Sequence, residues 1–447
     1  MFKMKTITLS LLALLLVMSF ASCASDTTSD LPLPSKDMKA YLQVKVTVDG
    51  SGDTRASRAT TGPKGGEDGD VREPGTNHEN EVNSLTVLLY KSDKDDLSEA
   101  DAKIDYVYTF TGLTASTPSS GGNVTYTTNP REIDPIIVGK AYRVLVIANA
   151  GDMTSSCKRK KISEIRDMQM DKVCTRDADI TKFSNFIMSS KKDARIDFTT
   201  KKGSETDPYL VEVDIERLAA RIDIIPTATY NETDKGYYYN VMDGTNVVGG
   251  FKLESVTPSK VLTNGEYLIK RVSPDKALTS ITYFGEEEMD ATSKASTNYV
   301  VCPWTKDRSG LTLSNAEGPA SLYDVKNVAS SKSYILDYVM ENTTTDNDVA
   351  NSTGLIFKGK YYEETEWDAA KTQPKVGVKG VDKEYTYTLR HSDPSGSGTL
   401  SDPMHFGVVR NNIYQVKVEG VEGKSKGIKL TIHVVPWAHY DHGEVIY

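Results

Sequence analysis

The 447-residue chain has few of the residues that enzymes commonly use for catalysis or metal binding. It contains only six histidines and four cysteines. It has no Gly-x-Ser-x-Gly elbow, P-loop, His-Glu-x-x-His pair or Cys-x-x-Cys pair. Hydrolytic, nucleotide-dependent and zinc-dependent chemistry therefore has no recognisable motif here. We predict a protein that is not an enzyme, with no catalytic residue, no cofactor and no metal site.

The chain also lacks an excess of positive charge. It has 53 Lys and Arg against 62 Asp and Glu, a net charge of −9, which argues against nucleic-acid binding and against adhesion to anionic lipid by charge alone. His439, Asp441 and His442 are chemically able to bind a metal. They lie beyond Pro436 in the last nine residues, where no rigid surrounding shell is evident, so a solvated end is the better interpretation.

Long hydrophobic runs are absent after the first segment. Ile7 to Met18 is apolar but too short to span a bilayer comfortably, and Lys3 and Lys5 precede it. The run leads into Ala21-Ser22-Cys23, which resembles a bacterial lipobox with Cys23 as the lipidated mature N-terminus. The alternative is an ordinary signal peptide with an incidental cysteine. Either way, residues 1–22 are predicted to be a signal peptide.

The three remaining cysteines do not suggest a disulfide framework. Cys157, Cys174 and Cys302 are an odd number, and a framework needs pairs. Export permits disulfides, so a bond between Cys157 and Cys174 stays open. Buried unreactive thiols are the favoured prediction.

The most informative feature is a similar short strand near each end of the chain. Strict alternation of apolar and polar residues predicts a strand with one apolar and one wet face. The apolar positions are Leu42, Val44, Val46 and Val48 in the first strand and Ile428, Leu430, Ile432 and Val434 in the second. Burying four such side chains contributes about 6–12 kcal/mol as an upper estimate, at about 1.5–3 kcal/mol each.

Two strands of one kind can fill one kind of groove. If the first were cut away, the second strand of a neighbouring molecule could take its place by pairing with the open sheet edge. Residues 49–81 have almost no apolar residues and contain Arg55, Arg58 and Arg72, which we expect to be accessible to proteases. The simpler alternative is that each strand is an ordinary member of its own sheet.

The rest of the chain predicts β-structure with little helix. Many short β-prone segments are separated by turn residues, as in antiparallel β-sandwiches. Glu216 to Ile225 is expected to form one long strand. Ile162, Ile165 and Met168 recur at helical spacing and predict a helix near residues 160–173.

Several motifs resemble a known family. They occur in order along the chain, at Val146–Asn149, Arg217–Arg221, Met340–Asn342, Val408–Tyr414 (Val-Val-Arg-Asn-Asn-Ile-Tyr), Val434–Trp437 and Glu444–Tyr447. With the lipobox, they resemble the FimA/Mfa-like fimbrillins, the type V pilins of Bacteroidales. Within that family the chain is most similar to the major shaft subunit of the Mfa-type (minor, short) fimbria.

The resemblance implies a sequence of events. A lipidated precursor reaches the outer membrane, and an arginine-specific protease cuts after the first strand. The C-terminal strand of an identical subunit then inserts into the opened groove. Arg55 best matches the family's cleavage arginine, with Arg58 close behind and Arg72 conceivable. Anchor and tip fimbrial subunits are the other implied partners, and adhesion and biofilm formation are the implied outcome.

The predicted architecture is mainly β, with two tandem transthyretin-like β-sandwich domains and few short helices. Residues 23–55 would be a propeptide with the removable strand. Residues 56–205 and 206–426 would be the two domains, and residues 427–447 the donor strand. The alternative function is a non-polymerising surface lipoprotein that binds glycan or host protein. Tyr237–Tyr239 and Tyr361–Tyr362 are its candidate aromatic contacts, although strand core explains them equally well.

Overall fold

The computed structural model describes part of the chain, in ranges that cover most of the predicted strands. These ranges are 39–48, 73–74, 77–91, 102–116, 124–176, 183–199, 203–234, 236–272, 299–300, 312–314, 323–324, 334–344, 350–391, 406–423 and 427–438. The predicted signal peptide, Cys23, Arg55, Arg58, Arg72, Cys302, His439, Asp441 and His442 lie outside them.

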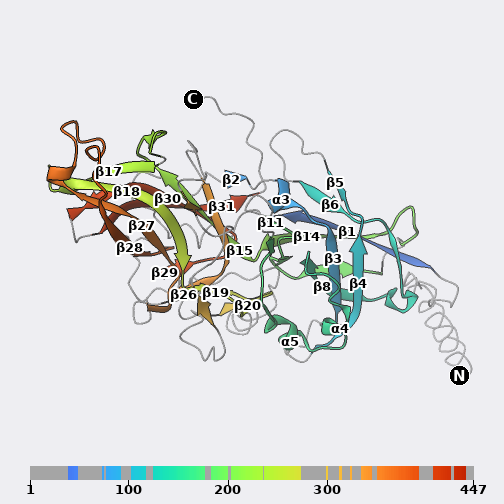
Figure 1. Cartoon of the computed structure of the whole chain (residues 1–447). Coiled ribbons are helices and arrows are strands. Elements are labelled where there is room, and N and C mark those ends of the chain that lie inside the picture. The colour runs from blue at the N-terminus through green and yellow to red at the C-terminus, as the bar shows by residue number, and fades with distance from the viewer. Residues whose placement is uncertain are drawn as a thin grey trace, which may run out of the picture.

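The fold is mainly β, as predicted, and its two largest sheets divide the chain by sequence (Figure 1). The first sheet has ten strands. In spatial order they are β4 (Ile104–Thr111), β3 (Ser84–Tyr90), β8 (Ala141–Ala148), β12 (Met188–Ser190), β14 (Tyr209–Arg217), β1 (Ala40–Val48), β6 (Thr125–Thr127) and β5 (Thr114–Ala115). In addition, β13 (Ala194–Asp197) pairs with β8 and β7 (Arg131–Ile133) pairs with β1.

The second sheet has eleven strands. Its main path is β2 (Glu73–Pro74), β31 (Ile428–Ala438), β30 (Asn412–Glu422), β17 (Gly236–Asp243), β18 (Asn246–Ser259), β27 (Gly354–Glu363) and β28 (Val381–Thr388). Off this path lie β15 (Ala219–Pro226), β25 (Tyr334–Met340), β16 (Tyr230–Asn231) and β24 (Tyr323–Asp324).

Small strand pairs and short helices complete the described structure. The pairs are β9 (Gln169–Met170) with β20 (Glu266–Tyr267), β10 (Thr175–Arg176) with β11 (Phe183–Ser184), β19 (Val261–Leu262) with β23 (Leu313–Ser314), β21 (Arg271–Val272) with β22 (Tyr299–Val300), and β26 (Asn342–Thr344) with β29 (Phe406–Val408). The helices are α3 (Asn77–Asn80), α4 (Thr154–Cys157) and α5 (Ile162–Arg166), with 3-10 turns η2 (Pro135–Ile137) and η6 (Glu364–Glu366). Among the described residues, no helix is long and apolar enough to cross a membrane.

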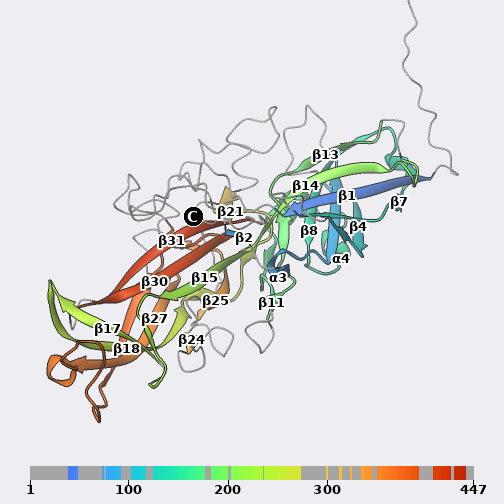
Figure 2. The same cartoon turned by 90° about the horizontal axis from the view of Figure 1, so that it is seen from above.

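Each large sheet covers its own apolar core, and the molecule is elongated. One cluster of buried apolar side chains comes mostly from the first sheet and the other from the second. Figure 2 shows β7 and the start of β1 at one end of the molecule, with β17 and β18 at the other. The first cluster also takes in Leu268, Tyr338 and Ile413 from the second half of the chain, so apolar packing continues across the junction.

The chain passes from one sheet to the other at Leu218. The prediction of a single strand from Glu216 to Ile225 is wrong, because β14 ends at Arg217 and β15 begins at Ala219. Leu218 is fully buried, and its backbone N–H donates to the carbonyl of Ile187 at 3.0 Å. The predicted boundary between residues 205 and 206 would separate β14 from the first sheet, in which it pairs with β1 and β12.

The predicted helix near residues 160–173 is much shorter than expected. It is α5, whose buried residues include Ile162 and Ile165. Beyond Asp167 the backbone becomes extended, and Met170 and its neighbour pair with β20. The helical spacing therefore identified the apolar face correctly, but pairing with a distant segment ends the helix after little more than one turn.

Cys157 and Cys174 are free and buried, which confirms the favoured prediction for these two cysteines. Burial raises the pKa of Cys157 to about 11 and that of Cys174 to about 12. Both are therefore neutral thiols at physiological pH, and neither is activated as a nucleophile.

Buried charged side chains connect the two sheets at the junction. Arg217, the last residue of β14, donates to the carbonyl of Glu79 at 2.9 Å and to the side chains of Asn80 and Asn411. Glu79 is fully buried and accepts hydrogen bonds from Arg221 and from the hydroxyl of Tyr338. Residues of α3, β14, β15 and β25 therefore meet in a dry polar network, which fixes how these elements approach each other.

The buried His391 predicts a pH dependence of stability. It bonds the Tyr414 hydroxyl at 2.7 Å, and burial lowers its pKa to about 4 from the usual 6.5. The unfolded chain therefore binds more protons than the folded chain between these values. Stability is fully present above pH 6.5 and falls as the pH drops to 4, by about 3 kcal/mol at most.

Urea unfolding of the wild type and His391→Gln between pH 7 and 4.5 measures this effect. We expect the stability of His391→Gln to fall less steeply with decreasing pH, because the group that must remain neutral is gone. His78→Gln, at an exposed site, is the matched control. Identical pH profiles for His391→Gln and the wild type would rule out His391 as the source.

Candidate strand-exchange groove

The first predicted strand, β1, lies in a slot between strands far from it in sequence. On one side it runs parallel to β14, from the pair Leu42–Tyr209 to the pair Val48–Ile215. On the other side it runs antiparallel to β7 near its start and to β6 near its end. Because β1 has sheet partners along both edges, its removal would open a groove rather than trim the edge of a sheet.

The apolar face of β1 is completely enclosed. Leu42, Val44, Val46 and Val48 are all 0% exposed, and the alternate residues are half-buried. The predicted removable-strand residues therefore all point into the core of the first sheet. At about 1.5–3 kcal/mol for each side chain, this burial accounts for most of the affinity of β1 for its slot.

Thr128 closes the gap where one neighbour of β1 changes to the other. Its backbone N–H donates to the carbonyl of Val44 at 2.9 Å, and its hydroxyl oxygen accepts from the Val44 N–H at 3.0 Å. Thr128 thus satisfies both backbone groups of Val44 where neither β6 nor β7 does. In the sequence this residue is marked only as the last residue of the short β-prone segment 124–128.

The wet face of β1 carries two ion pairs that are largely solvent-exposed. Lys45 pairs with Glu212 of β14 at 3.0 Å, and Lys39, just before β1, pairs with Glu132 of β7 at 3.1 Å. Exposed pairs of this kind contribute little to stability. The apolar face therefore holds β1 in place, with one ion pair at the start of the strand and the other near its end.

The second predicted strand, β31, occupies a different position. It pairs antiparallel with β30 from Ile428 to Pro436, and among the described residues its other edge is paired only at its end, by β2. Of its predicted apolar residues, Ile432 is buried, and Ile428, Leu430 and Val434 are partly buried against the core of the second sheet. The structure does not bring β1 and β31 together, since each lies in its own sheet.

The Arg-Asn-Asn segment that carried the family resemblance forms part of the junction. Asn411 has φ 57° and donates its backbone N–H to the carbonyl of Ala219 at 2.8 Å. Arg410 is buried and bonds the carboxylates of Glu266 and Glu341. These residues position the start of β30, the strand on which β31 rests.

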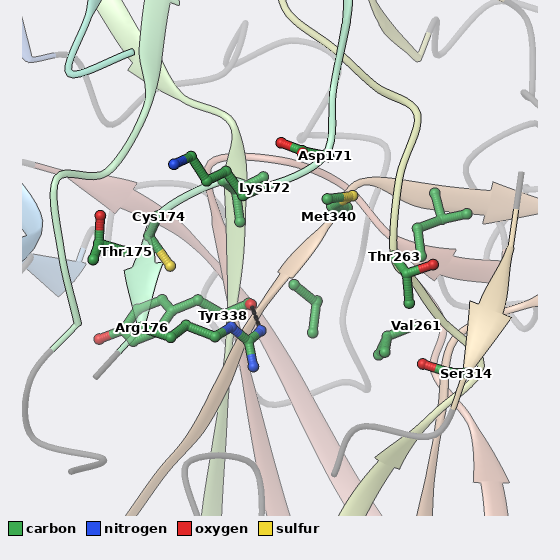
Figure 3. A pocket seen from close by; sticks show the side chains of 13 residues that line it. Asp171, Lys172, Cys174, Thr175, Arg176, Val261, Thr263, Ser314, Tyr338 and Met340 are labelled. Atoms are coloured by element: carbon green, nitrogen blue, oxygen red, sulfur yellow. Dashed lines mark hydrogen bonds between the residues drawn. The ribbon is translucent and has the colours of Figure 1, made fainter. Parts of the chain in front are cut away.

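A pocket of about 640 Å³ opens near the junction (Figure 3). Arg176 lies across it, bonded to the Tyr338 carbonyl at 2.6 Å and to Asp337 at 2.8 Å. Its buried lining residues are apolar, from Val173, Cys174, Val261, Leu262, Tyr338, Val339 and Met340. The Cys174 thiol is neutral and the Arg176 guanidinium is paired, and the lining also includes Asp171 and Lys172.

The candidate aromatic contacts are core residues. Tyr237, Tyr239, Tyr361 and Tyr362 are at most 5% exposed, and only Tyr238 of this set is half-buried. Tyr238 and Tyr362 pack against Trp367, which lies directly over Gly250. These side chains build the second sheet and present no exposed aromatic platform for a glycan.

Comparison with known proteins identifies a family over part of the chain. The model of the major fimbrial subunit protein (FimA) family matches residues 40–210, which begin at the first residue of β1. This match confirms the resemblance to fimbrillins over these residues. A search of curated proteins found no match.

The solved structures that match this chain have low sequence identity to it. A cell adhesion protein of Parabacteroides distasonis has 17% identity and a TM-score of 0.45, with 89% of this chain and 97% of that chain covered. The tip fimbrial protein Mfa3 of Porphyromonas gingivalis, truncated at its C-terminus, has 12% identity and a TM-score of 0.41, with 90% and 100% covered. A fimbrial assembly protein of Parabacteroides distasonis has 11% identity and a TM-score of 0.39, with 90% and 99% covered.

Thr128→Val should loosen β1 in its slot. The change keeps the shape of the side chain but leaves the buried N–H of Val44 without an acceptor, at a cost of about 1–3 kcal/mol. Urea unfolding of the uncut protein measures this loss. Thr127→Val, at a half-buried neighbouring position, is the control. Equal stability of the two variants would mean that Thr128 does not clamp β1.

Proposed function

We propose that this chain, which matches the FimA family over residues 40–210, is a shaft subunit of a cell-surface fimbria that polymerises by donor-strand exchange. The family match supports a structural subunit that assembles with other fimbrial subunits. The finer proposal is that cleavage after an arginine removes β1, and that β31 of an identical subunit replaces it. Adhesion and biofilm formation would follow from the fibre.

The observation that carries the proposal is the enclosure of β1. Its apolar face is fully buried, its two edges are both paired, and the segment that follows it contains Arg55, Arg58 and Arg72. A cut in that segment would leave β1 attached only by non-covalent contacts. Its loss would expose a long apolar groove that favours the entry of another strand with the same alternation.

The direction in which a donor strand would enter follows from the two sheets. The turn between β30 and β31 lies at the end of the second sheet away from the junction, where Val421 pairs with both Ile428 and Val241. If β31 swung out about Gly427, it would extend away from its own subunit, and Ile428 would be its residue nearest to that subunit. Entering at the outer end of a neighbour's groove, it would then run in the direction of β1, parallel to β14.

The remaining steps extend the proposal to the precursor. Cys23 would carry the lipid that holds the precursor at the outer membrane, and an arginine-specific protease would release it by cutting at Arg55, or at Arg58 or Arg72. Two β-sandwich domains, divided where the chain changes sheets at Leu218, would make up the subunit. Anchor and tip subunits would end the fibre.

The alternative is a surface lipoprotein that binds glycan or host protein without polymerising. The pocket lined by Arg176 and Tyr338 is the feature that favours it. Burial of the tyrosines of β17 and β27 weighs against a glycan platform of the expected kind. Strand exchange remains the better supported function.

A cleavage time course tests the proposal. We expect trypsin to release β1 from the purified precursor and to convert the rest of the chain into polymers, detected by light scattering. The variant lacking residues 427–447 should be cut at the same rate yet stay monomeric. Single Ala substitutions at Arg55, Arg58 and Arg72 should identify the cleaved bond. A cut full-length protein that remains monomeric after losing β1 would contradict the proposal.

A peptide of residues 427–447 tests the groove separately from fibre growth. We expect the fluorescently labelled peptide to bind the cut form of the subunit that lacks residues 427–447, but not the uncut form of the same subunit. Fluorescence anisotropy measures this binding. Ile432→Asp in the peptide should weaken binding at least about 100-fold, because it places a carboxylate in an apolar slot. Lys429→Asp, at an exposed position, is the control. Equal effects of the two changes would mean that the apolar face does not direct insertion.

A further inference from the structure

The slot of β1 has five inward positions that differ in size. They are held by Ala40, Leu42, Val44, Val46 and Val48, each at most 1% exposed. The smallest side chain lies at the outer end, and the four larger ones follow it. Another strand with the same alternation could enter in several registers, each shifted by two residues. A shift by one residue is excluded, because it would turn the polar face of the strand into the core.

The backbone of the slot adds a second requirement. The N–H of Val44 donates to the Thr128 hydroxyl at 3.0 Å, so Val44 directs its N–H towards the edge formed by β6. Alternate residues of a strand direct their N–H groups to the same edge, so Val46, which pairs with β6, does the same. Among the described residues, the pairing with β6 ends at Thr47. A residue without an N–H therefore fits at the position of Val48 but not further inside the strand.

Two carboxylates beside the slot lose their cations when β1 leaves. Glu132 of β7 lies opposite Tyr41 and pairs with Lys39 at 3.1 Å. Glu212 of β14 lies opposite Lys45 and pairs with it at 3.0 Å. The first carboxylate is at the start of the strand and the second is near its end. An incoming strand compensates both only if it carries cationic residues at these two depths.

We propose that β31 of a second copy of this chain enters the slot in a single register, in which Pro436 takes the last position of β1. The matched positions are then Ile428 with Ala40, Leu430 with Leu42, Ile432 with Val44, Val434 with Val46 and Pro436 with Val48. Two of the four aliphatic donor residues replace a residue of their own type. Pro436, which has no N–H, takes the one inward position where pairing with β6 has already ended.

The polar face of the donor strand fits in the same register. Lys429 would stand opposite Glu132, and His433 would stand opposite Glu212. An imidazole beside a carboxylate gains a proton more readily than a free one, so both lost cations are replaced. Exposed ion pairs contribute little to affinity. Their effect here is on the choice of register, because each pair forms at one depth of insertion.

The two neighbouring registers fail by separate requirements. A strand inserted two residues further would place Lys426 at the buried position of Ala40, which puts a charge in the core. A strand inserted two residues less far would place Pro436 at the position of Val46, where β6 pairs with the strand. In both registers Glu132 and the carboxylate of β14 would face uncharged residues. The lysine limits insertion in one direction and the proline limits it in the other.

This inference rests on the proposed function, and it adds what sets the depth of insertion. Pro436 acts as a positioning residue for the donor strand. A fixed depth gives every junction of the fibre the same spacing, which a repeating heterologous contact requires. The poorest fit of the register is Ile428 at the position of Ala40, because the slot holds a much smaller side chain there.

A comparison of two alanine substitutions in the 427–447 peptide tests the register. Binding to the cut subunit that lacks residues 427–447 is measured by fluorescence anisotropy. We expect Ile428→Ala to change the Kd less than about threefold, because alanine is the native side chain at that position of the slot. Leu430→Ala should weaken binding at least about 30-fold, because it leaves a cavity at the position of Leu42. Equal losses from the two changes would overturn the register.

Cysteine cross-linking measures the register directly. In the cut subunit with Glu212→Cys and without residues 427–447, we expect a disulfide with the His433→Cys peptide. Neighbouring strands lie about 4.8 Å apart, and a shift of two residues adds about 6.6 Å along the strand, which exceeds the reach of a disulfide. The Thr431→Cys peptide should therefore react at least about tenfold more slowly. The subunit with Glu212 unchanged measures the background from its other cysteines.

A third substitution tests the role of the proline. In a Pro436→Val peptide the inward position regains an N–H, so the strand can also stop two residues short. That register places Val435 opposite residue 212. Val435→Cys should then cross-link to Glu212→Cys at least about threefold faster in the Pro436→Val peptide than in the peptide that keeps the proline. Equal rates would mean that Pro436 does not set the depth.

These measurements separate the register from the proposed function. Failure of the wild-type peptide to bind the cut groove would overturn strand exchange itself. Tight binding with faster cross-linking at Thr431→Cys than at His433→Cys would leave strand exchange intact and overturn the register.

Discussion

The parallel seam between β1 and β14 is the constraint on which the rest of the structure depends. Every apolar side chain of β1 enters the core of the first sheet, and β14 supplies the neighbouring edge from Tyr209 to Ile215. β1 therefore stabilises the sheet through hydrogen bonds and apolar contacts with its neighbouring strands. Its buried face is apolar, and its wet face carries two ion pairs and the Gln43 amide, which donates to the Thr128 carbonyl at 2.9 Å. We propose that another strand with the same alternation would fit the same slot.

The junction explains how the first sheet can keep its shape when β1 is absent. β14 ends in Glu216 and Arg217, and both are buried: Glu216 pairs with Arg271 at 2.9 Å, and Arg217 bonds Glu79 and Asn411. Buried ion pairs often contribute more to a defined geometry than to net stability. Here they hold one end of the strand that forms the wall of the groove. The segment after the proposed cleavage region is held as well, because α3 places Glu79 in the same network.

The sequence predicted strands more reliably than it predicted their partners. Alternation over residues 41–48 and 428–434 identified both strands and their apolar faces, because a strand's burial pattern is local. The pairing of β1 with β14 is not local, since it joins residues about 167 positions apart. Nothing in the alternation itself marked Thr128, whose value comes from standing where two partner strands meet. The turn at Leu218 was equally hidden, because an apolar residue in a bend looks like one more strand residue.

The unequal burial of the two matched strands gives the proposed exchange its direction. β1 occupies a slot with sheet partners on both edges, whereas β31 lies against β30 and, within the described part of the chain, is paired on its other edge by two residues of β2. Moving β31 from its own sheet into a vacant slot would convert partly buried Ile428, Leu430 and Val434 into fully buried side chains. This added burial of the three side chains is a contribution that would favour polymer. While β1 stays in place no slot is vacant, so under this proposal the same strand would remain in its own subunit until cleavage.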